Sequence, residues 1–174
     1  MRPAIRLTVA VLVLLALCAL IAVRAGDRER SIRESRPATA DTPAMAVLRS
    51  WDRRRSAAYA VGSPGRLRAL YAPGTAAGAS DVRLLQGYRS RGWRVVGMRM
   101  QVLAVTVLER GRDRWRVRVT DRLADAVAVR AGHRVPLPRD QATTRVVTLT
   151  RSADGRWRVA GVVAAQGDVR PARR

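Results

Sequence analysis

After Gly92 the spacing of apolar residues changes from the period of a helix to the two-residue period of a strand. The clearest alternation is RWRVRVTD at residues 114–121, in which every second side chain points to the same face. The arginines share the solvent face, and the core-facing set is Trp115, Val117, Val119 and Asp121. Helices followed by consecutive antiparallel strands indicate an α+β domain, with the helices on one face of a curved sheet.

Three helices are predicted in the first half of this domain. The first covers residues 44–60. Ser63 is expected to cap a short second helix that has Pro64 at its first position, and Ser80 and Asp81 are expected to open a third. The residues expected to face the core are Met45, Leu48, Trp51, Ala58, Tyr59, Leu67, Leu70, Tyr71, Val82, Leu85 and Tyr88.

Four to five strands are expected to follow. A turn at residues 131–134 allows residues 135–137 to pair back, and a hairpin turn is predicted at residues 152–155. In the last strand Trp157, Val159 and Val163 are predicted to share one face, and Trp115 and Trp157 are predicted to be buried. The predicted strands are residues 98–109, 114–121, 126–130, 141–151 and 156–164.

The amino terminus holds an uncharged stretch, LTVAVLVLLALCALIAV, from Leu7 to Val23. As a helix it would span roughly 25 Å, close to the thickness of a bilayer core. We therefore predict a transmembrane helix that anchors the chain by a single pass. The alternative is a signal peptide cleaved after Ala25. Cys18 is expected to be a packing residue of this helix.

The predicted organisation has four parts: an anchor or signal at residues 1–24, a flexible linker at 25–43, the folded domain at 44–165, and a disordered tail at 166–174. Arginines after the span would favour a cytoplasmic domain by the positive-inside rule. A short charged leader before the span is the usual arrangement for export, and we expect an extracytoplasmic domain in the cell membrane.

The charge balance is strongly basic, with 34 basic and 13 acidic residues and a net charge of +21. All 34 basic residues are Arg, and Lys, Asn and Phe are absent, which is typical of a high-GC genome. Aromatic stacking platforms are missing, and nucleic acid is not an expected partner. One Cys and one His leave no disulfide framework and no zinc site of Cys or clustered His, so no metal and no cofactor are predicted.

Two motifs carry a resemblance to a known superfamily. GSPGRLRALYAPG at residues 62–74 resembles the short second helix of nuclear transport factor 2-like (NTF2-like, also SnoaL-like or cystatin-like) cone domains, and DGRWRV at 154–159 resembles their final hairpin. The resemblance covers residues 44–163. Ser63 stands where the family often has Asp, and the helix near residues 81–91 is additional. An anchor, a linker and such a domain also resemble actinobacterial Mce-associated membrane proteins and periplasmic domains of type IV secretion proteins, where the domain is a scaffold.

Some enzymes of this superfamily place an acid inside the cone, and Asp121 is the one weak catalytic candidate. A desolvated carboxyl could act as a base, and the simpler interpretation is a strand-end Asp paired with an Arg. Asp52 is expected to form a helix-surface ion pair with Arg55, and His133 is expected in an exposed turn. The three tyrosines are expected in the core with solvated hydroxyls, and the four tryptophans as core anchors.

The sequence therefore predicts a membrane-anchored, non-enzymatic interaction or scaffold module of the bacterial cell envelope. Its expected partners are the membrane, through Leu7 to Val23, and another envelope protein, and a homodimer stays open. The alternative is a small-molecule binder, or a lyase- or isomerase-type enzyme, that uses the cone. A third hypothesis is electrostatic binding of anionic lipid headgroups or wall polymer.

Overall fold

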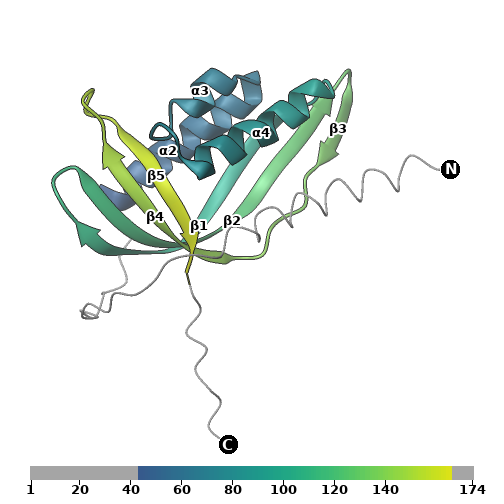
Figure 1. The fold of residues 1–174 in the computed structure, drawn as a ribbon. Coiled ribbons are helices and arrows are strands. Elements are labelled where there is room, and N and C mark those ends of the chain that lie inside the picture. The colour runs from purple at the N-terminus through teal and green to yellow at the C-terminus, as the bar shows by residue number, and fades with distance from the viewer. Residues whose placement is uncertain (1–42, 166–174) are drawn as a thin grey trace, which may run out of the picture. The chain divides into compact units, whose positions relative to one another are not determined.

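The computed structural model describes residues 43–165 (Figure 1). The predicted anchor, its cleavage site, Cys18, all but the last residue of the linker, and the tail lie outside the described residues. The described elements are α2 (Pro43–Val61), α3 (Pro64–Arg68), α4 (Ala76–Ser90), β1 (Arg94–Arg110), β2 (Arg114–Arg130), β3 (His133–Pro136), β4 (Thr143–Arg151) and β5 (Trp157–Ala164). Three helices pack on one face of a curved antiparallel sheet, which confirms the α+β prediction.

The helix starts follow local capping chemistry. Ser63 accepts a hydrogen bond from the Arg66 amide, and Pro64 occupies the first turn of α3, as predicted. The predicted start of α4 at Ser80 is wrong, because Thr75 caps the helix and accepts a hydrogen bond from the Gly78 amide. Residues 76–80 have no apolar period, so only the cap marks this first turn.

The sheet has the strand order β1-β2-β4-β5, and β3 pairs with the far end of β2. The prediction of separate strands at residues 114–121 and 126–130 is wrong, because they form one strand, β2. β1 pairs along the whole of β2, from Arg94 opposite Val129 to Arg110 opposite Trp115. Register shifts along β1 accommodate the bend of this long pair.

A bulge in β5 overturns the predicted face of Val163. Thr148 faces Gly161 while Leu149 faces Val159, which leaves Ala160 as the extra residue. The alternation is inverted beyond that point. Val159 therefore points into the core as predicted, whereas Val162 packs on the core and Val163 is 55% exposed.

The space between helices and sheet is filled by side chains from every layer. All three helices and the strands β1, β2, β4 and β5 contribute to its largest fully buried residues. These residues are Tyr59, Leu67, Leu85, Val105, Val117, Val119, Leu149 and Val159. Close packing of this kind is how a domain of this size obtains most of its stability. None of the helices within residues 43–165 has the length and apolar character needed to cross a bilayer.

Candidate functional site

A buried carboxylate, Asp81 on α4, connects α4 to α2 and to the segment after α3. Arg55 of α2 donates to it twice, from Nε to Oδ2 at 2.7 Å and from Nη2 to Oδ1 at 2.6 Å. The Tyr59 hydroxyl donates to Oδ1 at 2.6 Å, and the Tyr71 hydroxyl donates to Oδ2 at 2.7 Å. Each carboxylate oxygen thus has two donors, and we call these four residues the Asp81 cluster.

The electrostatics of this cluster are those of a closed structural unit. Burial alone would raise the pKa of Asp81, but Arg55 and the two hydroxyls together lower it below its ordinary value. Burial beside this carboxylate raises the pKa values of both Tyr59 and Tyr71. The prediction that these two hydroxyls are solvated is therefore wrong. A carboxylate with four donors has little capacity left for a substrate.

Asp121, the weak catalytic candidate, is buried on the helix-facing side of β2, on the face that its alternation predicts. Its Oδ2 accepts a hydrogen bond from Arg145 Nη2 on β4 at 2.6 Å. Its Oδ1 is buried and has no hydrogen-bond partner among the described residues. The carboxylate thus has one satisfied oxygen and one free oxygen, with 9% of the side chain exposed.

Asp52 of α2 supplies a second such oxygen. Its Oδ2 accepts a hydrogen bond from the Met100 amide of β1 at 3.4 Å, while its Oδ1 is buried without a partner among the described residues. The predicted ion pair with Arg55 is wrong, because Arg55 is turned toward Asp81. Burial raises the pKa of Asp52, and the nearby charge of Asp121 adds to that effect.

The charges of Asp121 and Arg145 both act on the Asp52 carboxyl, and Arg145 also donates to Asp121. Free buried oxygens of this kind can accept hydrogen bonds from a trapped water or a small polar ligand. No group of three or more His, Cys, Asp or Glu side chains within residues 43–165 is placed to hold a metal ion. The free oxygens of Asp52 and Asp121 can thus each accept a hydrogen bond from a donor group.

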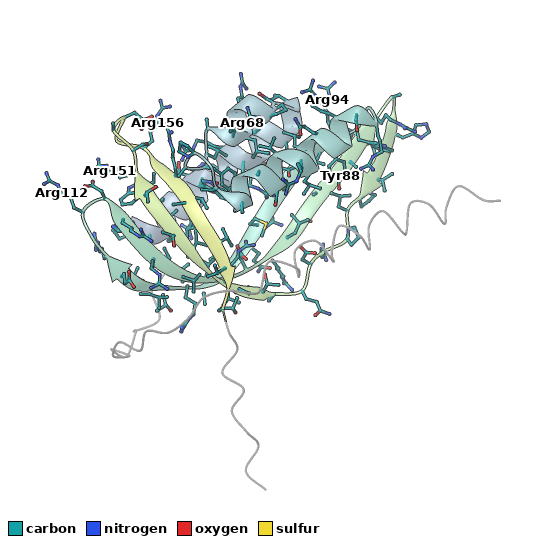
Figure 2. The ribbon with its side chains drawn as sticks, in the orientation of Figure 1. Arg68, Tyr88, Arg94, Arg112, Arg151 and Arg156 are labelled. Carbon is teal, nitrogen blue, oxygen red and sulfur yellow. The ribbon has the colours of Figure 1, made fainter. Side chains whose placement is uncertain are left out.

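His133 lies in an exposed position at the turn between β2 and β3, as predicted. It lines a hollow of about 340 Å³ together with Arg94, Arg130, Arg134, Val96 and Val129, among others. We call this feature the turn hollow. A second hollow, of about 490 Å³, lies at the tips of the β1–β2 and β4–β5 hairpins and includes Arg112, Asp113 and Arg151 (Figure 2).

Three of the four tryptophans pack in or against the core, whereas Trp93 lies outside the core cluster, so the prediction of a core anchor at Trp93 is wrong. Trp115 is buried, and its ring centroid lies 4.3 Å from that of the half-buried Trp157. Trp51 meets Tyr71 edge to face at 5.7 Å, and its Nε1 donates to the Leu70 carbonyl. Contacts of this kind anchor strands and helices to each other and leave no open aromatic cage between these rings.

Comparisons with known proteins show what this chain resembles in its fold. No family model and no curated protein matches the chain. The intermembrane space region of the chloroplast protein ARC6 is similar, with a TM-score of 0.51 and 13% identity, over 71% of this chain and 95% of that one. The likeness concerns the fold alone, which in this chain is three helices on one face of a five-stranded antiparallel sheet.

Two further structures are similar at TM-scores below 0.5, and the fold assignment does not depend on them. Aln2 from a Streptomyces species has a TM-score of 0.47 and 15% identity, over 72% of this chain and 93% of that one. A ketosteroid isomerase-like protein from Erwinia carotovora atroseptica has a TM-score of 0.42 and 15% identity, over 70% and 95%. At these identities the likeness concerns the fold and carries no activity to this chain.

Proposed function

We propose that the chain is a membrane-anchored, non-enzymatic module that holds other proteins of a bacterial cell envelope together. The observation that carries this proposal is the filled interior of the cone. Apolar side chains occupy it, and its most buried charged cluster, around Asp81, is saturated by donors from α2 and from the segment after α3. A cone built for ligand chemistry would instead keep an open pocket with several convergent polar groups.

The placement of the module comes from the sequence. The apolar stretch from Leu7 to Val23 is long enough to cross a bilayer once, and the short charged leader before it favours an extracytoplasmic domain. The proposed partner is another envelope protein, in the manner of the Mce-associated architecture, and self-association into a homodimer would use the same module.

The anchor predicts a specific fractionation result. Carbonate washing of membranes is expected to leave the full-length chain in the pellet, because a spanning helix resists extraction. The control is a chain with Leu14→Arg and Leu15→Arg, which breaks the apolar stretch and is expected to move to the wash. A soluble mature form that begins at Gly26 would contradict the anchor and support a cleaved signal peptide.

A second function is favoured by one observation, the free buried oxygens of Asp52 and Asp121. Under this alternative the cone binds a small polar molecule, and Asp121 acts on it as a general base or acid. The two proposed functions predict different effects of the substitution Asp121→Asn on activity and ligand binding. As a base Asp121 needs its charge, whereas in a scaffold the carboxylate only pairs with Arg145.

Under the scaffold proposal, Asp121→Asn is expected to lower the free energy of unfolding by about 1 kcal/mol, because Arg145 is partly solvated and keeps water as a partner. Capture of the envelope partner by the full chain should be unchanged, as measured by quantitative cross-linking in membranes. Asp125→Asn, which alters an exposed ion pair, is the matched control. Loss of a turnover or of a small-molecule complex in Asp121→Asn alone would instead establish the second function.

A further inference from the structure

The turn hollow concentrates positive charge at one end of the sheet. Arg94, Arg130, Arg134 and His133 line it, and no carboxylate is among its lining residues. Arg94 lies at the same end of the domain as the β2–β3 turn (Figure 2). Because like charges repel when they converge, a cluster of this kind favours the binding of an anion.

Strand register places two of these arginines as a pair. Arg94 of β1 faces Val129 of β2, which in turn faces Arg134 of β3. Directly opposed residues on antiparallel strands project to the same face. The backbones of Arg94 and Arg134 lie two strand spacings apart, which is about 10 Å. Arginine side chains are long enough for both guanidiniums to contact one small group placed between them.

Arg130 is held in place before any ligand arrives. Its guanidinium lies over the Trp93 ring, 4.8 Å from the centroid, and its Nη1 donates to the Arg91 carbonyl at 3.3 Å. Gly92, which precedes Trp93, has a φ of 73°, a conformation that Gly adopts without strain. A side chain that is already ordered loses less conformational entropy when it binds.

The turn itself carries local strain. Ala131 has a φ of 43° and Gly132 a φ of 82°, so both central residues of the hairpin turn are left-handed. Gly adopts this conformation freely, but Ala does not. The turn sets Arg130 directly opposite His133. Alternation puts this pair on the opposite face of the sheet from Arg94 and Arg134, so the two pairs line the hollow from its two sides.

Among the described residues, the arginines of the turn hollow have no counter-ion. The ion pairs of the described residues engage Arg55, Arg99, Arg116, Arg139, Arg145 and Arg158. Within residues 43–165, none engages Arg94, Arg130 or Arg134. The charge of the turn hollow therefore stays available to an external anion.

We propose that the turn hollow binds a phosphate group, carried either by an anionic lipid headgroup or by a small soluble phosphate compound. Phosphate suits it because a doubly charged tetrahedral group can accept forked hydrogen bonds from two guanidiniums at once. For a domain tethered to a membrane, this site would add a headgroup contact to the anchor.

The test uses the full chain in a neutral detergent, titrated calorimetrically with inorganic phosphate and, separately, with short-chain dihexanoyl phosphatidic acid below its micelle concentration. In the double variant Arg94→Gln/Arg134→Gln, affinity is expected to fall by about tenfold or more, since two charge-assisted contacts are lost. The charge-matched control is Arg112→Gln/Arg156→Gln at the hairpin tips, where affinity should change by less than about twofold.

A third variant, Arg94→Lys/Arg134→Lys, keeps the net charge and removes the forked geometry, and it decides the question if the Gln variant does not fold. We expect it to bind several-fold more weakly than the unchanged chain. Binding of both probes with similar affinity would indicate a soluble phosphate ligand, and binding of the lipid alone would indicate a headgroup. Equal weakening in the Gln variant and its control, or no saturable binding of either probe below about 10 mM, would overturn the proposal.

Discussion

Replacing Asp81 by Ala is expected to lower the free energy of unfolding by about 3–5 kcal/mol, because removal of one partner leaves a buried charge unpaired. The change would strand the guanidinium of Arg55 and the hydroxyls of Tyr59 and Tyr71 in the core. Since these groups come from α2 and from the segment after α3, the packing of all three helices would loosen. Urea denaturation of the full chain in mild detergent, followed by tryptophan fluorescence, measures the loss.

The matched control is Asp125→Ala, which removes the carboxylate of an exposed pair with Arg99. Exposed pairs contribute about 1 kcal/mol or less, so this variant should unfold almost like the unchanged chain. Similar losses in the two variants would show that burial of the Asp81 cluster contributes nothing beyond an ordinary ion pair.

The pH dependence of stability gives an independent check. The pKa of Asp81 lies below its ordinary value, so its stabilisation is complete above the unfolded-state pKa of about 3.9 and is lost as the pH falls through the folded-state value. Asp81→Ala should therefore flatten the acid side of the stability profile. For Asp52 the pH dependence runs in the opposite direction. Its pKa is raised, so its contribution to the free energy of unfolding is lost as the pH rises through the folded-state pKa.

Local signals in the sequence were enough for the order of the elements. Ser63 and Pro64 define the start of α3 because cap chemistry is set within a few residues. The alternation at residues 114–121 fixes which side chains enter the core, including Asp121, because a strand has a period of two.

Other features depend on contacts between distant segments. Whether residues 114–130 form one strand or two is decided by β1, which pairs along their whole length. The bulge at Ala160 arises from pairing between β5 and β4, and it moves Val163 to the surface. No periodicity within a single segment records such a shift.

The buried polar groups were the least predictable part of the candidate site. Arg55 lies on the apolar stripe of α2, one turn from Trp51 and from Tyr59, and that position was a usable signal. A guanidinium on a core-facing stripe requires a buried acid, although the sequence does not say which one. Asp81 was interpreted as the opening of a helix, whereas it lies within α4 and turns inward.

The second large effect is expected at Trp115, where a change to Ala should cost about 3–5 kcal/mol through lost burial and the cavity left behind. Trp115 is 8% exposed, its ring packs at a tilt against that of Trp157, and its Nε1 donates to the Gly111 carbonyl at 2.9 Å. The free energy of unfolding of a domain of this size is about 5–15 kcal/mol in total, so the variant would be close to unfolding. Chemical denaturation, followed by far-ultraviolet circular dichroism, measures the loss.

Trp93→Ala is the matched control, because Trp93 is only half-buried and lies outside the core cluster, with its ring against Arg130. It should cost about 1 kcal/mol, the scale of one partly exposed cation–π contact. Trp157→Ala should fall between the two, since its ring is half-buried but packs on the core. If Trp115→Ala and Trp157→Ala both cost less than about 1 kcal/mol, these rings cannot join β2 to β5 across the core, and the strand phases that also place Asp121 inside the cone would be wrong.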